Sequence, residues 1–117
     1  MCSSDLLRTH VNCLHAATHV LVKGDAHPRD LVRMLWDCAD MSIVSANLMS
    51  RGSPYHMVTC GACAELCEAC IEYCADSDDP ILLLCADACR ESALLCREME
   101  SHGERSAAEW GDRKSVV

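Results

Sequence analysis

The sequence predicts an all-α protein, an antiparallel up-down-up-down four-helix bundle with a short C-terminal tail. Glycine, proline and small polar residues divide the 117 residues into four stretches of similar length, and each break has the chemistry that ends one helix or begins the next. Cysteines at positions 60, 63, 67, 70 and 74 follow the spacing that keeps side chains on one stripe of a helix. Short loops between helices of this length favour antiparallel neighbours.

The first two helices are predicted over residues 4–23 and 25–51. Ser4 is a typical N-cap residue, and Gly24 can adopt the left-handed conformation that ends a helix. The second helix opens with an aspartate followed by Pro28, which suits a first helical turn, and it ends before a glycine.

The third and fourth helices are predicted over residues 53–75 and 80–102. A serine followed by Pro54 opens the third helix, and the acidic turn DSDD closes it. An aspartate followed by Pro80 opens the fourth helix, which we expect to end near a histidine with Gly103 as its cap.

The length of the chain fits one domain with a single modest core. We therefore expect residues 1–103 to form the bundle and residues 104–117 to form a polar tail.

Helical periodicity predicts which side chains face the core. On the first helix the predicted inward stripe is Leu7, His10, Leu14, Ala17 and Leu21, with Cys13 at its edge. The second helix contributes one inward cysteine, the third its whole stripe of five, and the fourth a further three. Three inward positions that could have carried more thiols hold serine instead, namely Ser42, Ser45 and Ser92.

Pairs of cysteines spaced Cys-x-x-x-Cys point to metal binding. Residues four apart on a helix have Cβ atoms about 5–6 Å apart, so their sulfurs can converge on one ion. Thiolates in a row suit Cu(I), whereas zinc generally takes four tetrahedral ligands, and no single tetrahedral centre is evident from the spacing. We expect several Cu(I) ions, with zinc as a further ion that thiolates bind. The predicted ligands are Cys13, Cys38, Cys60, Cys63, Cys67, Cys70, Cys74, Cys85, Cys89 and Cys96.

Two other interpretations fit the thiols. One is an iron–sulfur electron carrier, although the run CGACAELCEAC lacks the ligand spacings of ferredoxins. The other is a structural or partner-binding bundle with incidental or zinc-binding thiols, because free cysteine often packs as a small apolar residue. A core built from thiols in place of leucines loses stability unless something binds there, which favours the metal-binding interpretation. We expect no enzyme, since no nucleophile, base and orienting acid group together.

Charge and composition limit the partners and the compartment. The formal net charge is −8, without a cluster of Lys and Arg that could follow a phosphate backbone, so nucleic acid is not expected as a partner. No stretch has the length and apolarity of a membrane span, and the N-terminus lacks a signal-peptide pattern. We expect a cytoplasmic protein, in which 11 cysteines serve metal binding rather than disulfides.

The Cys-x-x-x-Cys repeats of the third and fourth helices resemble those of the bacterial copper storage proteins, Cys-rich four-helix bundles often mislabelled ferredoxin-like. The resemblance covers residues 4–102. It implies storage of many Cu(I) ions by core thiolates, a copper donor or acceptor as partner, and a homo-oligomer such as a tetramer. Because its N-terminus shows no leader-peptide pattern, the chain is similar to the cytosolic branch of these proteins. It departs from the pattern in having only Cys13 and Cys38 on its first two helices. This departure implies that the protein stores fewer Cu(I) ions than other members, and that most of them bind between the third and fourth helices.

One end of the bundle is the expected metal entrance. Antiparallel topology brings the start of the first helix, the end of the second, the start of the third and the end of the fourth together. Thioethers and imidazoles there could pass Cu(I) inward by ligand exchange. The predicted entry residues are His10, Met49, His56, Met99 and His102.

Overall fold

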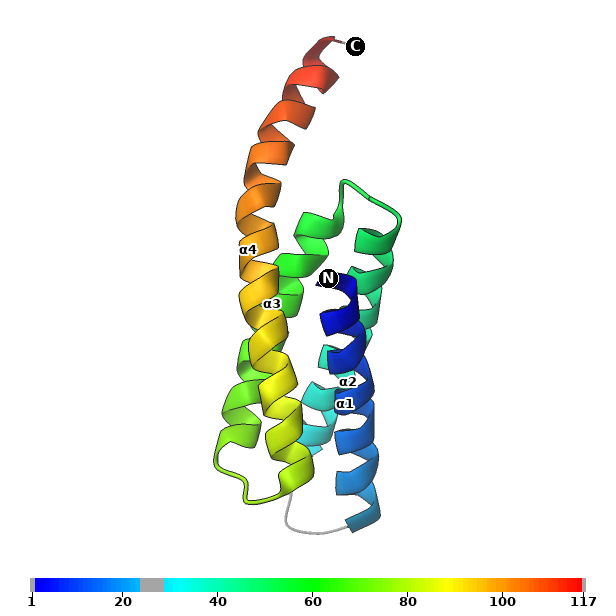
Figure 1. Cartoon of the computed structure of the whole chain (residues 1–117), viewed down its shortest axis with the longest axis vertical. Coiled ribbons are helices and arrows are strands. Elements are labelled where there is room, and N and C mark those ends of the chain that lie inside the picture. Colours follow the sequence, from blue (N-terminus) through cyan, green and yellow to red (C-terminus); the bar gives the residue numbers. More distant parts are fainter. Residues whose placement is uncertain (1, 24–28, 117) are drawn as a thin grey trace.

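Four helices make up the structure, a computed structural model that describes the backbone of residues 2–23 and 29–116 and the side chains of residues 4–23 and 29–99. They are α1 (Cys2–Lys23), α2 (Arg29–Ser50), α3 (His56–Ala75) and α4 (Pro80–Val116). The helices lie side by side and alternate in direction (Figure 1). The predicted all-α four-helix bundle is confirmed.

The helices pack as a ring around a central axis. The backbones of α1 and α2, α2 and α3, α3 and α4, and α4 and α1 approach one another. Diagonal helices meet through side chains at the axis, where Cys38 Sγ of α2 lies 3.9 Å from Cys89 Sγ of α4. None of the helices in the described chain is long and apolar enough to cross a membrane.

A glycine turn separates α2 from α3 and sets where α3 begins. Gly52 has a φ of 67°, and the N–H of Ser53 reaches the carbonyl of Leu48 at 2.9 Å, as in a Schellman motif. The Ser53 hydroxyl then accepts the N–H of Tyr55 at 3.2 Å. Because this side chain holds the chain in a turn, α3 begins at His56 and not at residue 53, so the predicted start was wrong.

Asp79 caps α4 as the sequence predicts. Its Oδ1 accepts the N–H of Ile81 at 3.0 Å, and its carbonyl accepts the N–H of Leu83 at 3.0 Å. Pro80 occupies the first helical position, where its missing N–H costs nothing. The other side-chain oxygen of Asp79 lies 2.6 Å from His19 Nε2 and 3.2 Å from Lys23 Nζ. One carboxylate thus ties α1 to α4 at the end of the bundle opposite the glycine turn.

This contact predicts an acid-dependent contribution to stability. The contact with His19 lowers the pKa of Asp79 from 3.8 to about 2. Because the folded pKa is the lower one, the carboxylate stabilises the fold above 3.8 and this contribution is lost as the pH falls towards 2. We expect Asp79→Asn to lower Tm at pH 7 and to lose less stability than wild type between about pH 4 and 2. Thermal melts at pH 7 and between about pH 4 and 2 measure both effects. The control is Asp87→Asn, which alters an exposed carboxylate; an equal effect of both variants would contradict the prediction.

α4 is longer than predicted. It continues to Val116, past Gly103, and it projects beyond the α2–α3 turn (Figure 1). A single glycine costs a helix only about 1 kcal/mol relative to alanine, and the sequence that follows is rich in Glu, Arg and Ala. The predicted helix end near His102 was therefore wrong, whereas the division into a bundle and a tail stays a prediction.

The core-facing side of α1 also differs from the prediction. The stripe expected on this helix includes Leu7, Leu14 and Leu21, which are 43%, 38% and 54% exposed. Apolar residues lie on two sides of α1, so periodicity alone did not fix its rotation. The buried positions, from one end of α1 to the other, are Leu6, Thr9, Cys13, Ala16, Ala17 and Val20.

The predicted start of α1 differs from the structure. α1 begins at Cys2, so Ser4 lies within its first turn and is not the N-cap. The residues expected to end α1 and to open α2, Gly24, Asp25 and Pro28, lie outside the described residues.

Candidate metal centre

All ten predicted ligand cysteines are fully buried in the core, and none of them forms a disulfide. α3 and α4 supply eight of the ten, whereas α1 supplies Cys13 and α2 supplies Cys38. The core is therefore made largely of sulfur and alanine. Whether each thiol is a metal ligand stays a prediction.

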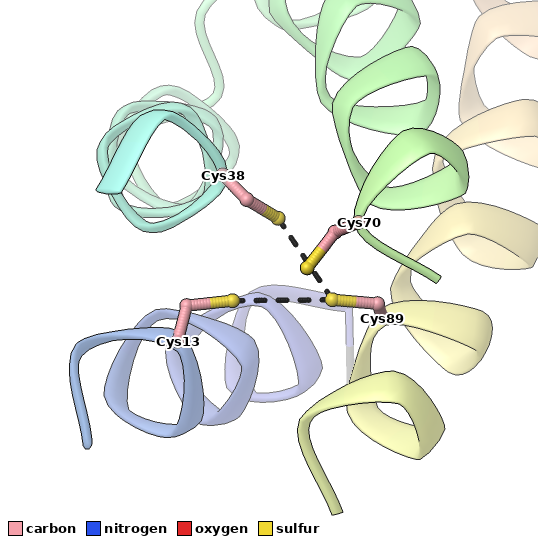
Figure 2. A group of neighbouring side chains, drawn as sticks. All are labelled: Cys13, Cys38, Cys70 and Cys89. Carbon is pink, nitrogen blue, oxygen red and sulfur yellow. Dashed lines mark hydrogen bonds between the residues drawn. The ribbon is translucent and has the colours of Figure 1, made fainter. Parts of the chain in front are cut away.

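Four thiols, one from each helix, meet on the axis of the bundle. The Sγ atoms of Cys13, Cys38, Cys70 and Cys89 all lie within 4.8 Å of one another, and Figure 2 shows their side chains pointing towards one common point. Cys89 Sγ lies 3.9 Å from the sulfurs of both Cys13 and Cys38. We call this set the four-thiol centre.

The four-thiol centre has nearly the size that a tetrahedral metal site requires. Sulfurs bound to one ion at about 2.3 Å lie roughly 3.8 Å apart, so only a small contraction is needed. The sequence interpretation did not foresee this group of four sulfurs. It considered spacing within each helix, whereas the four-thiol centre depends on how all four helices align along the axis.

Further thiols continue from the four-thiol centre towards the end of the bundle where Asp79 lies. Cys70, Cys74 and Cys85 form a second group within 4.8 Å. Cys13 Sγ lies 3.4 Å from Cys85 Sγ, so the two groups are in contact. Metal ions could therefore bind side by side along the axis.

In the other direction the thiols lead towards the glycine turn. Cys67 Sγ lies 3.5 Å from Cys38 and 3.9 Å from Cys63. The thiols of Cys60 and Cys63 both interact with that of Cys96. A row of sulfur atoms thus runs from the four-thiol centre nearly to the end of the bundle.

Neighbouring thiols shift one another's pKa values in opposite directions. Contacts with Cys67 and Cys96 lower the pKa of Cys63 to about 4, and contacts with Cys13 and Cys70 lower the pKa of Cys85 to about 5. Contacts with Cys13 and Cys38, together with burial, raise the pKa of Cys89. The physical cause is that the first thiolate formed accepts S–H hydrogen bonds and opposes ionisation of its neighbours. Metal binding must therefore displace protons from the thiols that remain protonated.

Hydroxyl groups occupy the core positions between the thiols. Ser42 Oγ lies 3.7 Å from Cys63 Sγ. The hydroxyls of Thr9 and Ser92 contact each other, and Thr9 also donates to the carbonyl of Ala88 at 3.0 Å. Ser45 Oγ is buried and has no hydrogen-bond partner in the described part of the chain. The inward serines were predicted, whereas Thr9 was missed with the rotation of α1.

A pocket beside the glycine turn brings several predicted entry residues together. Met49, His56 and Met99 line it, with Met57, which the sequence analysis did not single out. Met49 Sδ accepts a hydrogen bond from the Cys60 thiol at 3.9 Å. His56 Nδ1 is buried without a hydrogen-bond partner among the described residues. Soft sulfur and imidazole donors therefore adjoin the outer end of the thiol row.

Of the other two predicted entry residues, His10 does not line this pocket. His10 donates its Nδ1 proton to the carbonyl of Ala39 at 2.7 Å. Ala39 lies beside Cys38, about 15 Å along α2 from Met49, so His10 sits near the middle of the bundle. The side chain of His102 lies outside the described residues.

Comparison with known proteins agrees with the thiol-lined bundle. A family model described as "Copper storage protein" matches residues 1–101. The chain belongs to the copper storage protein family. Among curated proteins, the "Uncharacterized cysteine-rich protein YhjQ" of Bacillus subtilis (strain 168) is 31% identical over 94 residues, which cover 76% of this chain and 87% of that protein.

Two solved structures share the fold of this family member. The Cu(I)-bound copper storage protein BsCsp3 is 30% identical with a TM-score of 0.79, covering 85% of this chain and 94% of the other. The Nmul_A1745 protein of Nitrosospira multiformis is 29% identical with a TM-score of 0.79, covering 86% and 92%. The resemblance to copper storage proteins stated from the cysteine repeats is confirmed.

Proposed function

We propose that the protein binds and stores several Cu(I) ions in the cytoplasm, through the thiolates that line its core. The observation that carries the proposal is the row of ten buried cysteines centred on the four-thiol centre. Thiolates are soft ligands that favour Cu(I), and Cu(I) accepts the low coordination numbers that a row of sulfurs provides. The related copper storage protein BsCsp3 is Cu(I)-bound in its solved structure, which supports Cu(I) as the ion that this protein stores.

Storage requires exchange with other copper-binding molecules but no turnover. The protein would take Cu(I) from a donor and release it to an acceptor, and it would act as a store rather than an enzyme. The thiols are buried at the centre of the bundle, where bound ions would be shielded from water and oxidants. Exposed apolar side chains on α1, such as Val11 at 61% and Val22 at 81%, agree with a homo-oligomer such as a tetramer.

Metal content after growth in copper tests the function. We expect the protein expressed in copper-supplemented cells and purified anaerobically to be colourless and to contain several copper ions per chain by elemental analysis. Brown protein with iron and sulfide would instead support the iron–sulfur carrier. Protein without any of these metals, and unchanged in stability when they are added, would support a structural bundle.

The pocket beside the glycine turn is the proposed entrance for Cu(I). Its donors Met49 and His56 adjoin the outermost thiols, so an ion could pass by ligand exchange from thioether to thiolate. We expect the double variant Met49→Leu/His56→Ala to load Cu(I) from a chelator at least several-fold more slowly, with the same final capacity. Stopped-flow absorbance at the chelator band measures the rate.

A variant at the opposite end provides the control for the entrance. Ile81→Ala alters a partly buried residue near Asp79, away from the proposed entrance, and should load at the wild-type rate. Equal loading rates for the entrance variant and wild type would contradict the proposed role of Met49 and His56 in the entry of Cu(I).

A further inference from the structure

We propose that two copies of the chain pair through the outward side of α1, with their α1 helices antiparallel and a two-fold axis at Leu14. This interface adds to the proposed homo-oligomer, on which it rests, the surface through which the copies meet. Leu7, Val11, Leu14 and Leu21 all lie on the outward side of α1 and are exposed. Four large apolar side chains on one side of a helix need a reason, because they lie in water in the single chain.

The spacing of these residues is that of a contact between two helices. Positions 7, 11, 14, 18 and 21 alternate steps of four and three, which is the spacing of the apolar seam in a coiled coil. Thr18 completes the stripe and carries no charge. The stripe covers about 21 Å of helix. So regular a stripe on the outside of the bundle indicates a partner helix that one copy of the chain does not supply.

Charge also distinguishes α1 from the other helices. Between Arg8 and Lys23 the sequence has no Asp, Glu, Lys or Arg, whereas the exposed sides of α2, α3 and α4 each carry several. A helix side that faces water normally carries charged residues. The net charge of the chain is −8, so two copies repel each other where their acidic sides meet. The uncharged side of α1 lets a second copy approach without that repulsion.

α2 extends the apolar surface next to Leu14. His10 bonds to the carbonyl of Ala39, which fixes the level of α1 against α2. Because the two helices run antiparallel, Leu14 lies close to the level of Trp36. Trp36 lies one turn before Ala39 on the side of α2 that meets α1, and it is 46% exposed. A half-exposed tryptophan at the centre of an apolar surface is typical of the residues that dominate binding at interfaces.

The stripe is complementary to itself, which identifies the partner as a second copy. A two-fold interface uses the same surface on both copies. In an antiparallel pair centred on Leu14, that residue meets its own counterpart, and Leu7 meets Leu21 of the second copy because the two lie equally far from the centre. α1 and α2 together offer a face of roughly 650 Å² from their lengths and diameters, near the ~800 Å² per partner of a stable interface.

An antiparallel pair leaves both metal stores accessible. α1 begins towards the end of the bundle where the glycine turn lies (Figure 1), so pairing through α1 places the two proposed entrances at opposite ends of the dimer. The acidic outer sides of α3 and α4 stay exposed to other molecules.

Charged residues at the predicted axis test the pairing. Light scattering after size-exclusion chromatography measures the mass of the reduced full-length protein. We expect wild type to be a dimer or a larger even-numbered assembly, and Leu14→Glu and Leu14→Lys each to have half that mass or less. An equal mixture of the two variants should recover the wild-type mass, because position 14 faces its own counterpart. Leu94→Glu changes an exposed leucine of α4 and is the matched control, which should keep the wild-type mass.

The outcomes separate this interface from the proposed function. An assembly that keeps its mass in Leu14→Glu, or a mixture that stays dissociated, would overturn the interface and leave the homo-oligomer in place. A monomeric wild type would contradict the homo-oligomer as well. Both Leu14 variants should store as much Cu(I) as wild type, so failure of copper binding in wild type is a separate result. If these variants do not fold by circular dichroism, Val11→Glu, at a more exposed position of the stripe, decides in their place.

Discussion

Loading the reduced protein with Cu(I) should raise its unfolding temperature by roughly 15 °C or more. Ligand at a thousand times its dissociation constant adds about 4 kcal/mol to the free energy of unfolding for one site. A change of 1 kcal/mol shifts Tm by about 4 °C in a domain of this size. Because the four-thiol centre takes one thiol from each helix, ions bound there should hold the whole bundle together. Differential scanning calorimetry of the apo and loaded forms measures the shift.

The double variant Cys13→Ser/Cys38→Ser tests the structural basis of that shift. It removes the described thiols of α1 and α2 and leaves those of α3 and α4, so it should still bind Cu(I) but lose most of the gain in Tm. Cys60→Ser, which removes one thiol near the glycine turn, is the control and should keep most of the gain. Full stabilisation of the double variant would show that copper does not link the four helices.

The double variant Ser42→Cys/Ser45→Cys should store about two more Cu(I) ions per chain than wild type. Both serines are fully buried, and Ser42 already lies 3.7 Å from the Cys63 sulfur. Ser45 Oγ has no hydrogen-bond partner among the described residues, so replacing it with a thiol gives up no hydrogen bond. Saturation with Cu(I) followed by desalting and elemental analysis measures the capacity.

Ser50→Cys is the matched control for this gain. Ser50 is an exposed residue of the same helix, so the variant adds a thiol outside the core and its capacity should stay at the wild-type value after desalting in the presence of a competing chelator. An unchanged capacity in Ser42→Cys/Ser45→Cys would contradict the view that core thiols set the number of stored ions.

Local chemistry made much of the fold predictable. The aspartate and proline that open α4 and the left-handed Gly52 that follows α2 act through short-range hydrogen bonds, which a sequence displays directly. The cysteine stripes of α3 and α4 were predictable for the same reason, since helical periodicity places them on one face. The length of α4 was not, because a single Gly103 weakens a helix without ending it.

The arrangement of the site depended on relations between helices that a single sequence does not contain. α1 carries apolar residues on two sides, and packing against α2 and α4 selects the side with Leu6 and Cys13 over the side with Leu7 and Leu14. The axial register of all four helices brings Cys13 and Cys38 to the level of Cys70 and Cys89. The same register places His10 near the middle of the bundle, where it bonds to Ala39.

Competition for Cu(I) tests the central claim most directly. The reduced protein is titrated anaerobically against a high-affinity Cu(I) chelator, and the copper on protein and chelator is quantified after separation. The account predicts that each chain removes several Cu(I) ions from the chelator, up to about one per core thiol. Removal of one ion or none would contradict the assignment of the core as a copper store.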